Sequence, residues 1–217
     1  MAPTFHVDTS QSRTLLIAPA VFLAVAALSV FLRFRSRAKR KQRLLWDDWL
    51  CATSLILSFG CYASIIVCVV YGGLGKTITM LEPEQIPTVF KALFSISVLW
   101  ATTVSTVQIA ILCLYTRIFT AIPWHRNACH AAMITVFCWW TSTFVTTITT
   151  CIPVESFWNP MIPGKFINLK VFCIASGLLH VFLDIFILTF PLPMIWGLNT
   201  KRSNKITVSA AFLIGLL

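Results

Sequence analysis

The stretch HVFLDIFILTFPLPMIWGL, residues 180–198, holds a single carboxylate, Asp184, in an otherwise apolar run. A helix of about 20 apolar residues can cross the hydrocarbon core of a bilayer. A carboxylate at that depth is costly unless it faces the interior of a helical bundle and finds a partner. Pro191 and Pro193 follow it and are expected to kink or end the helix. The stretch therefore predicts a membrane helix with one interior acid, provided that the rest of the chain also suits a bilayer.

Long uncharged runs recur along the whole chain. Only 11% of its 217 residues are charged, whereas soluble domains carry about 25%. Five runs, interrupted by no charge except Asp184, are long enough to span a bilayer: Thr14–Leu32, Trp49–Gly75, Ala92–Thr116, Asn127–Val154 and Val171–Thr200. They exclude a water-soluble core. They predict an all-α, polytopic transmembrane helical bundle with helices near residues 14–32, 49–71, 92–116, 128–152 and 171–198.

The two ends of the chain need separate interpretation. Residues 1–13 are predicted to form an exoplasmic tail, and residues 14–217 one transmembrane domain. The segment 206–217 would span only about 18 Å as a helix, so we expect an incomplete sixth helix in a fragment; the alternative is a segment that does not span. The first run could instead be a signal peptide with a cleavage site near Ala24, but the basic stretch that follows favours a retained helix.

Basic residues are distributed unevenly between the two sides of the predicted bundle. The loops after the first, third and fifth helices carry twelve Lys and Arg, seven of them between Arg33 and Arg43, against five on the other side. Cytoplasmic loops of membrane proteins are enriched in Lys and Arg. We therefore expect an exoplasmic N-terminus and a location in the plasma membrane. This topology accounts for the net charge of +10, so no nucleic-acid partner is expected.

The motif WDDWL marks the start of the second predicted helix. Trp46 and Trp49 suit the membrane–water interface. Asp47 and Asp48 can accept hydrogen bonds from the free N–H groups at the helix N-terminus and face the positive end of its dipole. The motif is interpreted as a capped and anchored helix start. A cytoplasmic contact with another helix or with a partner protein is the alternative.

Asp184 needs a partner, and no Lys or Arg of this chain lies at the same predicted depth. Neutral candidates are Gln108, Thr103 and Thr106 on the third helix and His180 one turn earlier on its own helix. Two interpretations remain open. The acid and its partners are either polar contacts that hold helices together, or a site that senses a ligand or a proton.

Cysteines and glycines offer two further motifs. Of eight cysteines, only Cys151 and Cys173 approach the oxidising exoplasmic side, so they are the candidate disulfide pair, with two free thiols as the alternative. No His/Cys cluster has metal-ligand spacing, and no metal or cofactor is expected. YGGLGKT resembles the end of a P-loop, but Val70 stands where that motif needs glycine and a membrane helix precedes it. The nucleotide site is therefore rejected.

Six strings occur in a fixed order along the chain: RLLWDDWLC, YGGLGKTI, AILCLYTRIF, CIPVESFWNP, LDIFILTFPLPMIWGL and AAFLIGLL. Together they resemble the fungal rhodopsin-domain family of receptor-like seven-helix membrane proteins, over roughly Leu28 to the C-terminus. The resemblance implies an exoplasmic N-terminus, and it implies that the seventh helix and part of the sixth are not in this chain. The matching positions are Asp47, Asp48, Gly75, Tyr115, Arg117, Cys151, Pro153, Trp158, Asp184, Pro191 and Pro193.

Several positions depart from the family pattern. Thr77 stands where the family often has histidine, Gln108 where it often has lysine, and His180 where asparagine is usual. Phe166 occupies the place of a usual cysteine, which weakens the family's loop disulfide unless Cys173 substitutes for it. These departures argue against a shared ligand mechanism. The family name does not imply retinal.

Two classes of function are weighed. A receptor-like sensor would use Asp184, His180 and Gln108 as ligand or switch residues, with Tyr115 and Arg117 at the cytosolic end of the third helix acting toward a cytosolic signalling protein. A simple positive-inside anchor is the alternative for Arg117. The second class is a transporter or a non-signalling structural protein. No enzyme is expected, because acid-based intramembrane hydrolysis needs two cooperating carboxylates. The ligand is left open, and the lipid bilayer is the expected environment.

Overall fold

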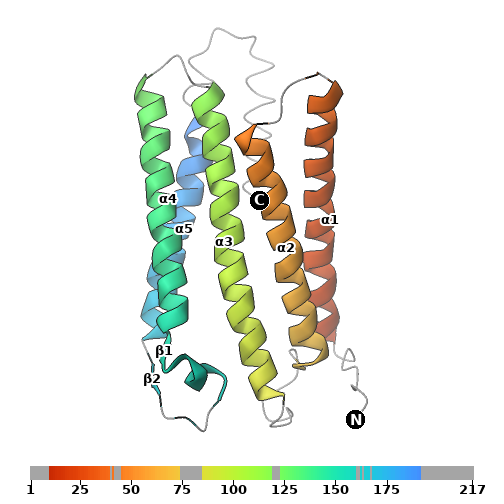
Figure 1. Cartoon of the computed structure of the whole chain (residues 1–217), viewed down its shortest axis with the longest axis vertical. Coiled ribbons are helices and arrows are strands. Elements are labelled where there is room, and N and C mark those ends of the chain that lie inside the picture. Colours follow the sequence, from red (N-terminus) through yellow and green to blue (C-terminus); the bar gives the residue numbers. More distant parts are fainter. Residues whose placement is uncertain are drawn as a thin grey trace.

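The computed structural model describes residues 10–39, 41, 45–73, 85–118, 123–159, 162, 164–166 and 168–191. Five long helices run side by side (Figure 1). They are α1 (Ser10–Lys39), α2 (Trp46–Val70), α3 (Ile86–Ile118), α4 (Pro123–Thr149) and α5 (Leu169–Thr189). Each is long and apolar enough to cross a membrane. The predicted all-α, polytopic bundle is thereby confirmed. The expected sixth helix at 206–217, Pro193 and the glycine-rich turn after Gly73 lie outside the described residues.

Helices α1 to α4 form a row, and α5 lies behind α3 and α4 (Figure 1). α1 packs on α2, α2 on α3 and α3 on α4, while α5 contacts both α3 and α4 (Figure 1). Arg37 and Lys39 lie in the last turn of α1, at the end of the bundle where α2 begins and α3 ends. We call this the basic end. The opposite end carries the short segment between α4 and α5, and we call it the hairpin end.

A small hairpin not predicted from the sequence closes one end of the bundle. Strands β1 (Cys151–Ile152) and β2 (Lys165–Phe166) pair antiparallel, with Cys151 opposite Phe166. A 3-10 helix, η2 (Val154–Phe157), follows β1. The ring of Phe157 packs edge-on against Phe90 and Phe94 of α3, with centroid distances of 5.5 and 6.1 Å. These contacts hold η2 over the ends of α3 and α4.

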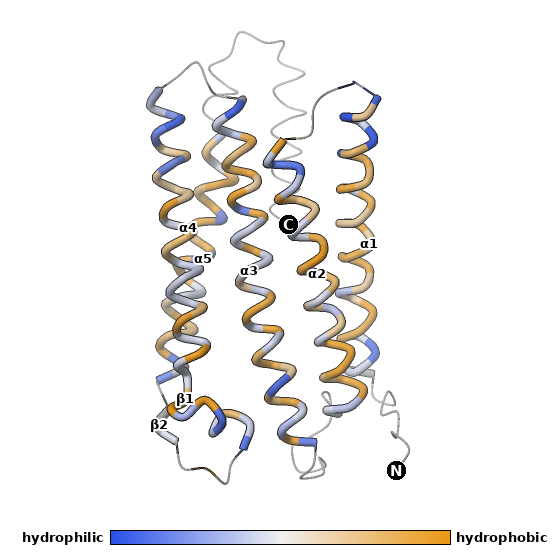
Figure 2. Tube along the Cα trace, in the orientation of Figure 1, coloured by the Kyte–Doolittle hydropathy of each residue, from blue (hydrophilic) through white to orange (hydrophobic). Residues whose placement is uncertain are grey.

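Hydropathy follows the helix axes. Hydrophilic residues gather toward the basic ends of α1 and α4, and apolar residues fill most of the helix length between (Figure 2). The main buried apolar cluster lies where α3, α4 and α5 meet, with Leu112 and Val136 fully buried within it. Apolar residues also cover outward faces, as the 75% exposure of Phe22 on α1 shows. Such faces suit contact with lipid.

The ends of α2 and α5 follow from local sequence. Gly72 ends α2 at a place where no side chain fits, because an added Cβ would lie 2.5 Å from the Cys68 carbonyl oxygen and 2.7 Å from Val89 Cγ2. α5 ends at Thr189 with Phe190 as its C-cap. Phe190 keeps helical backbone angles and Pro191 is helical again, so the helix is interrupted immediately before the proline, where a kink or an end was predicted. The rest of the predicted extension, residues 192–198, lies outside the described part.

Candidate functional site

The acid of α5 meets an amide of α3. Gln108 Nε2 donates a hydrogen bond of 2.7 Å to Asp184 Oδ1. Gln108 is only 3% exposed, whereas the side chain of Asp184 keeps 44% of its surface exposed in the described part of the chain. Gln108 is thus the first of the four expected partners of Asp184 that the structure brings into contact with it. Among the described residues, Gln108 Oε1 and the hydroxyl of Ser105, one turn earlier on α3, are buried without a hydrogen-bond partner.

His180 supplies a second contact to the acid. Its Nδ1 lies 3.4 Å from Asp184 Oδ2, across one turn of α5. The imidazole packs against two indoles, with centroid distances of 5.4 Å to Trp100 and 5.0 Å to Trp139. The other two expected partners do not join this group. Thr103 and Thr106 donate their hydroxyl hydrogens to carbonyl oxygens four residues earlier on α3, which satisfies them within their own helix.

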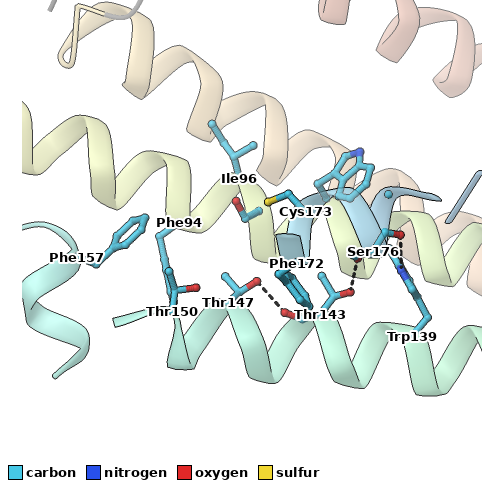
Figure 3. A pocket seen from close by; sticks show the side chains of 13 residues that line it. Phe94, Ile96, Trp139, Thr143, Thr147, Thr150, Phe157, Phe172, Cys173 and Ser176 are labelled. Atoms are coloured by element: carbon cyan, nitrogen blue, oxygen red, sulfur yellow. Dashed lines mark hydrogen bonds between the residues drawn. The ribbon is translucent and has the colours of Figure 1, made fainter. Parts of the chain in front are cut away.

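A cavity of about 400 Å³ lies on the hairpin side of these two indoles, between α3, α4, α5 and η2 (Figure 3). Its aromatic lining comprises Phe94, Trp100, Trp139, Phe157 and Phe172. Its hydroxyl lining comprises Ser97, Thr143, Thr147, Thr150 and Ser176, and Ile96, Cys173 and Gly177 complete the wall. None of these described lining residues is charged. We call this cavity the aromatic pocket.

Polar contacts tie the floor of the aromatic pocket to α5. Trp139 Nε1 donates a hydrogen bond of 3.1 Å to the Ser176 carbonyl oxygen, and the Thr143 and Ser176 hydroxyls lie 3.3 Å apart. Trp139 also packs edge-on against Trp100, at 6.3 Å between ring centroids. The same two indoles thus line the pocket and contact His180, which contacts Asp184. The pocket and Asp184 are therefore linked through shared side chains.

This pocket was not predicted from the sequence. One available signal was the spacing of Trp139, Thr143, Thr147 and Thr150, which places them along one side of a helix. Thr143, Thr147 and Thr150 do lie in a row along α4 (Figure 3). Residues 128–152 were predicted only as a membrane helix, and the polar face within that helix was not distinguished from the apolar one.

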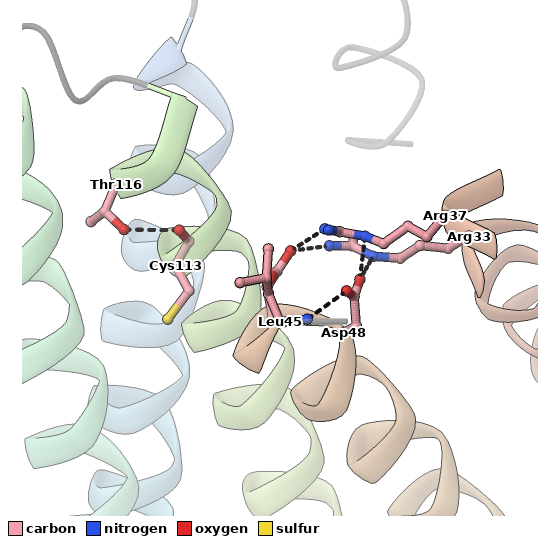
Figure 4. Close-up of polar contacts among 7 residues, drawn as sticks. Arg33, Arg37, Leu45, Asp48, Cys113 and Thr116 are labelled. Carbon is pink, nitrogen blue, oxygen red and sulfur yellow. Dashed lines mark hydrogen bonds and ion pairs between the residues drawn. The ribbon is translucent and has the colours of Figure 1, made fainter. Parts of the chain in front are cut away.

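The basic end holds a second polar group, at the WDDWL motif. Arg33 and Arg37 reach from α1 to the start of α2 (Figure 4). Arg33 contacts Asp47 at 2.6 Å and Asp48 at 2.9 Å; Arg37 contacts Asp47 at 2.7 Å and Asp48 at 2.8 Å. Asp48 Oδ2 also accepts a hydrogen bond of 3.1 Å from the backbone N–H of Leu45. We call Arg33, Arg37, Asp47 and Asp48 the ionic clasp.

The WDDWL motif therefore combines a hydrogen-bonded helix start with a contact to another helix. Asp48, 1% exposed, caps the helix and at the same time contacts another helix. Trp46 and Trp49 point away from the bundle, and Trp46 is 83% exposed, as an interfacial anchor requires. Arg33 and Arg37 were interpreted from the sequence only as determinants of membrane topology, and their role in joining α1 to α2 was not predicted.

The remaining candidates at the basic end differ in environment. Arg117 is exposed at the end of α3 and forms no ion pair among the described residues. Tyr115 is buried and stacks on Phe190 at 6.5 Å between ring centroids. His125 of α4 packs on the same ring at 5.6 Å. Tyr115 thus links α3 to the end of α5, immediately before the buried Pro191.

The candidate disulfide is not formed: Cys151 and Cys173 are both free thiols. Cys151 is buried in β1, whereas Cys173 is exposed on α5 and lines the aromatic pocket (Figure 3). Burial raises the pKa of the Cys151 thiol above its ordinary value, which favours the protonated and less reactive form. The two cysteines lie at the same end of the bundle, but the hairpin and the helix direct them to different surroundings.

Known proteins that resemble this chain agree with the membrane-spanning fold. The sequence pattern of the fungal rhodopsin domain matches residues 32–217. A "Polyenoic acids biosynthesis gene cluster protein Ba17b" of Metarhizium anisopliae is 23% identical over 201 residues, which cover 90% of this chain and 54% of that protein. A "SAT4 family membrane protein" of Emericella nidulans is 23% identical over 160 residues, which cover 71% of this chain and 41% of that protein. The chain spans about half the length of these curated relatives, and no solved structure matches it.

Proposed function

Because the chain belongs to the fungal rhodopsin domain family, we propose that this multi-pass membrane protein is receptor-like. In this proposal, a small and largely apolar molecule binds in the aromatic pocket and alters the contacts of α5. One observation carries the proposal: Trp100 and Trp139 line the pocket, and the same two rings pack against His180. A ligand that touches Trp139 acts on α5 at two points, the Ser176 carbonyl and the His180 ring.

A route from the pocket to the basic end is available within α5. His180 contacts Asp184, and Asp184 binds Gln108 of α3. Nearly two turns further on, Phe190 stacks on Tyr115. A small rotation or shift of α5 would change both contacts, because packed helices switch between discrete arrangements rather than deform continuously. In this proposal Tyr115 and the exposed Arg117 present the change to a signalling protein.

The proposed orientation places the hairpin end outside the cell and the basic end in the cytosol, with the plasma membrane as the site of action. The concentration of Lys and Arg in the last turns of α1 and just after it supports this orientation. It would let a molecule from outside reach the pocket beside η2, and a cytosolic partner reach Arg117. Addition of a protease to intact cells tests it, because an N-terminal epitope should be removed while the segment 33–43 stays protected.

The aromatic lining of the pocket and the name of one relative suggest a first ligand to test. The name of the Metarhizium relative refers to the biosynthesis of polyenoic acids. A conjugated polyene chain is flat and apolar, and it matches a pocket walled by five aromatic rings. We therefore propose polyenes as a ligand class to be tested with this chain.

The proposal is tested by adding a fluorescent conjugated tetraene to the protein in lipid nanodiscs and measuring energy transfer from tryptophan. We expect saturable binding above the signal of empty nanodiscs. Trp139→Phe should lower both the energy transfer and the affinity. Trp124→Phe is the matched control, because Trp124 lies on the same helix, is highly exposed and is not among the pocket residues. Non-saturable uptake equal to that of empty nanodiscs would contradict the proposal.

A transporter is separated from a receptor by a second measurement on the same sample. Liposomes loaded with a polyene-binding protein would accumulate the tetraene faster with this chain than without it if the chain transported it, whereas a receptor would leave the rate of passive uptake unchanged. We propose no chemical reaction at this site. The described side chains that bond Asp184 are an amide and an imidazole, not the second carboxylate that acid-based hydrolysis uses.

A further inference from the structure

We infer that the aromatic pocket selects an uncharged ligand that carries a hydrogen-bond donor, such as a hydroxyl group, at the end nearest the hairpin. This inference rests on the proposed function and names the chemistry of the ligand. It is drawn from the hydrogen bonds that the pocket hydroxyls already make.

The hydroxyls near the hairpin end have already used their hydrogens. Thr147 donates to the Thr143 carbonyl oxygen and Thr150 to the Thr146 carbonyl oxygen, each at 2.8 Å. Ser97 of α3 donates to the Leu93 carbonyl oxygen at 2.9 Å. A hydroxyl group has one hydrogen but two lone pairs. These three groups therefore still accept hydrogen bonds, whereas each must first break a bond within its own helix in order to donate.

The available donors lie deeper in the pocket. The hydroxyls of Thr143 and Ser176 share one hydrogen bond, which leaves one hydrogen free between them. The indole N–H of Trp139 is occupied by the Ser176 carbonyl oxygen, and that of Trp100 has no partner among the described residues. α4 runs from the basic end to the hairpin end, so Thr147 and Thr150 lie nearer the hairpin end than Thr143 does. A ligand with its donor toward the hairpin end and its apolar body against the indoles satisfies this arrangement.

Charge points to the same conclusion. No described lining residue carries a charge. The ammonium group of Lys91 lies outside the lining, 5.8 Å from the ring centroid of Trp158, where it makes a cation–π contact. An ionised carboxylate placed among these rings would lose its hydration without gaining a cation, and such burial is strongly unfavourable. The pocket should therefore discriminate against an ionised acid and in favour of an alcohol with the same apolar body.

The test uses three tetraenes with the same chain, ending in a primary alcohol, a methyl ether or a carboxylic acid. Each is titrated into nanodiscs at pH 8, and binding is corrected for partition into empty nanodiscs. We expect the alcohol to bind about 5- to 10-fold more tightly than the methyl ether, the change that one net hydrogen bond produces. The ionised acid should bind more weakly than the alcohol.

A matched pair of variants locates the acceptor. Thr147→Val removes one of the three accepting hydroxyls and should reduce the affinity for the alcohol about 5- to 10-fold, while leaving that for the ether unchanged. Thr141→Val is the control, because Thr141 makes the same kind of bond to its own helix but is exposed and is not among the pocket residues. It should leave both affinities unchanged.

Each outcome decides the inference. Equal or tighter binding of the ether or the ionised acid would overturn it and leave the binding pocket itself intact. An equal effect of Thr147→Val on alcohol and ether would also overturn it, because the hydroxyl would then act only through packing. If none of the three compounds binds saturably, the proposed function fails and this inference fails with it. The comparison of ligands uses the unmodified protein, so it stands even if a variant does not fold.

Discussion

Gln108 on α3 donates a 2.7 Å hydrogen bond to Asp184 on α5. This bond joins helices that lie far apart in the sequence, and it explains how a carboxylate is accommodated in a membrane helix. The neutral amide takes the place that a cation would otherwise occupy. Because His180 connects the same carboxylate to the wall of the aromatic pocket, the bond also lies between that pocket and the basic end.

Gln108→Leu should destabilise the protein, because Asp184 loses its amide donor. We expect a loss of about 1–3 kcal/mol, the cost of leaving a buried polar group unsatisfied, with the lower part of that range more appropriate for a half-exposed carboxylate. Asp184→Asn should be milder, since its amide oxygen can still accept the bond. Thermal unfolding in detergent, followed by size-exclusion chromatography, measures both. A Gln108→Leu variant as stable as the unmodified protein would show that the bond contributes nothing.

Arg37→Met should weaken the attachment of α1 to α2. It leaves the nearly fully buried carboxylates of Asp47 and Asp48 with Arg33 as their only partner in the ionic clasp. Removing one partner from a buried ion pair typically costs about 3–5 kcal/mol. We therefore expect a large fall in the yield of folded protein.

Arg35→Gln is the control for the ionic clasp. Arg35 belongs to the same basic stretch but is exposed and forms no ion pair among the described residues. The charge lost is the same as in Arg37→Met, so an equal loss of yield in both variants would assign the effect to membrane insertion rather than to the clasp.

Cys173 should react with N-ethylmaleimide much faster than Cys151. Burial raises the pKa of the Cys151 thiol, so at any pH near neutrality less of it is the reactive thiolate. Its labelling should stay slow until the pH rises above the ordinary thiol pKa, whereas Cys173 is exposed. Peptide mass spectrometry without reducing agent measures both. A peptide pair bridged through these two cysteines would contradict the structure.

Two glycine substitutions should have opposite effects. Gly72→Ala places a Cβ against the Cys68 carbonyl and Val89, which must separate α2 from α3 and lower the unfolding temperature. Gly177→Ala has open space around the added carbon. It should stabilise α5 by about 0.5–1 kcal/mol, since alanine is the better helix former. If both variants lower the unfolding temperature equally, the close approach at Gly72 is not the cause.

The sequence predicted the helices well because hydrocarbon imposes a simple rule: charges must stay out of the spanning segments. The same rule predicted that Asp184 needs a neutral partner, and Gln108 and His180 were among those proposed. The helices extend beyond the uncharged runs, as Arg33 and Arg37 in α1 show. Basic side chains can lie within the last turns of a helix where carboxylates or water receive them.

The features that the sequence could not predict depend on how closely residues from different helices and loops approach one another in space. Cys151 and Cys173 were placed at the same end of the bundle, but a disulfide needs close approach and correct direction, which spacing does not reveal. Strands of two residues, β1 and β2, are too short to leave a pattern. The aromatic pocket depends on Trp100 and Trp139 meeting across α3 and α4, and in the sequence each is an ordinary membrane tryptophan.

The most direct test of the account is hydrogen–deuterium exchange in α5, residues 182–190, with and without a saturating tetraene alcohol. The account predicts that exchange in this segment changes when the unmodified protein binds the alcohol. In Gln108→Leu the alcohol should still bind, but the change near Tyr115 and Phe190 should be lost. Full occupancy of the pocket with no change in α5 exchange in the unmodified protein would contradict the claim that the pocket acts through this helix.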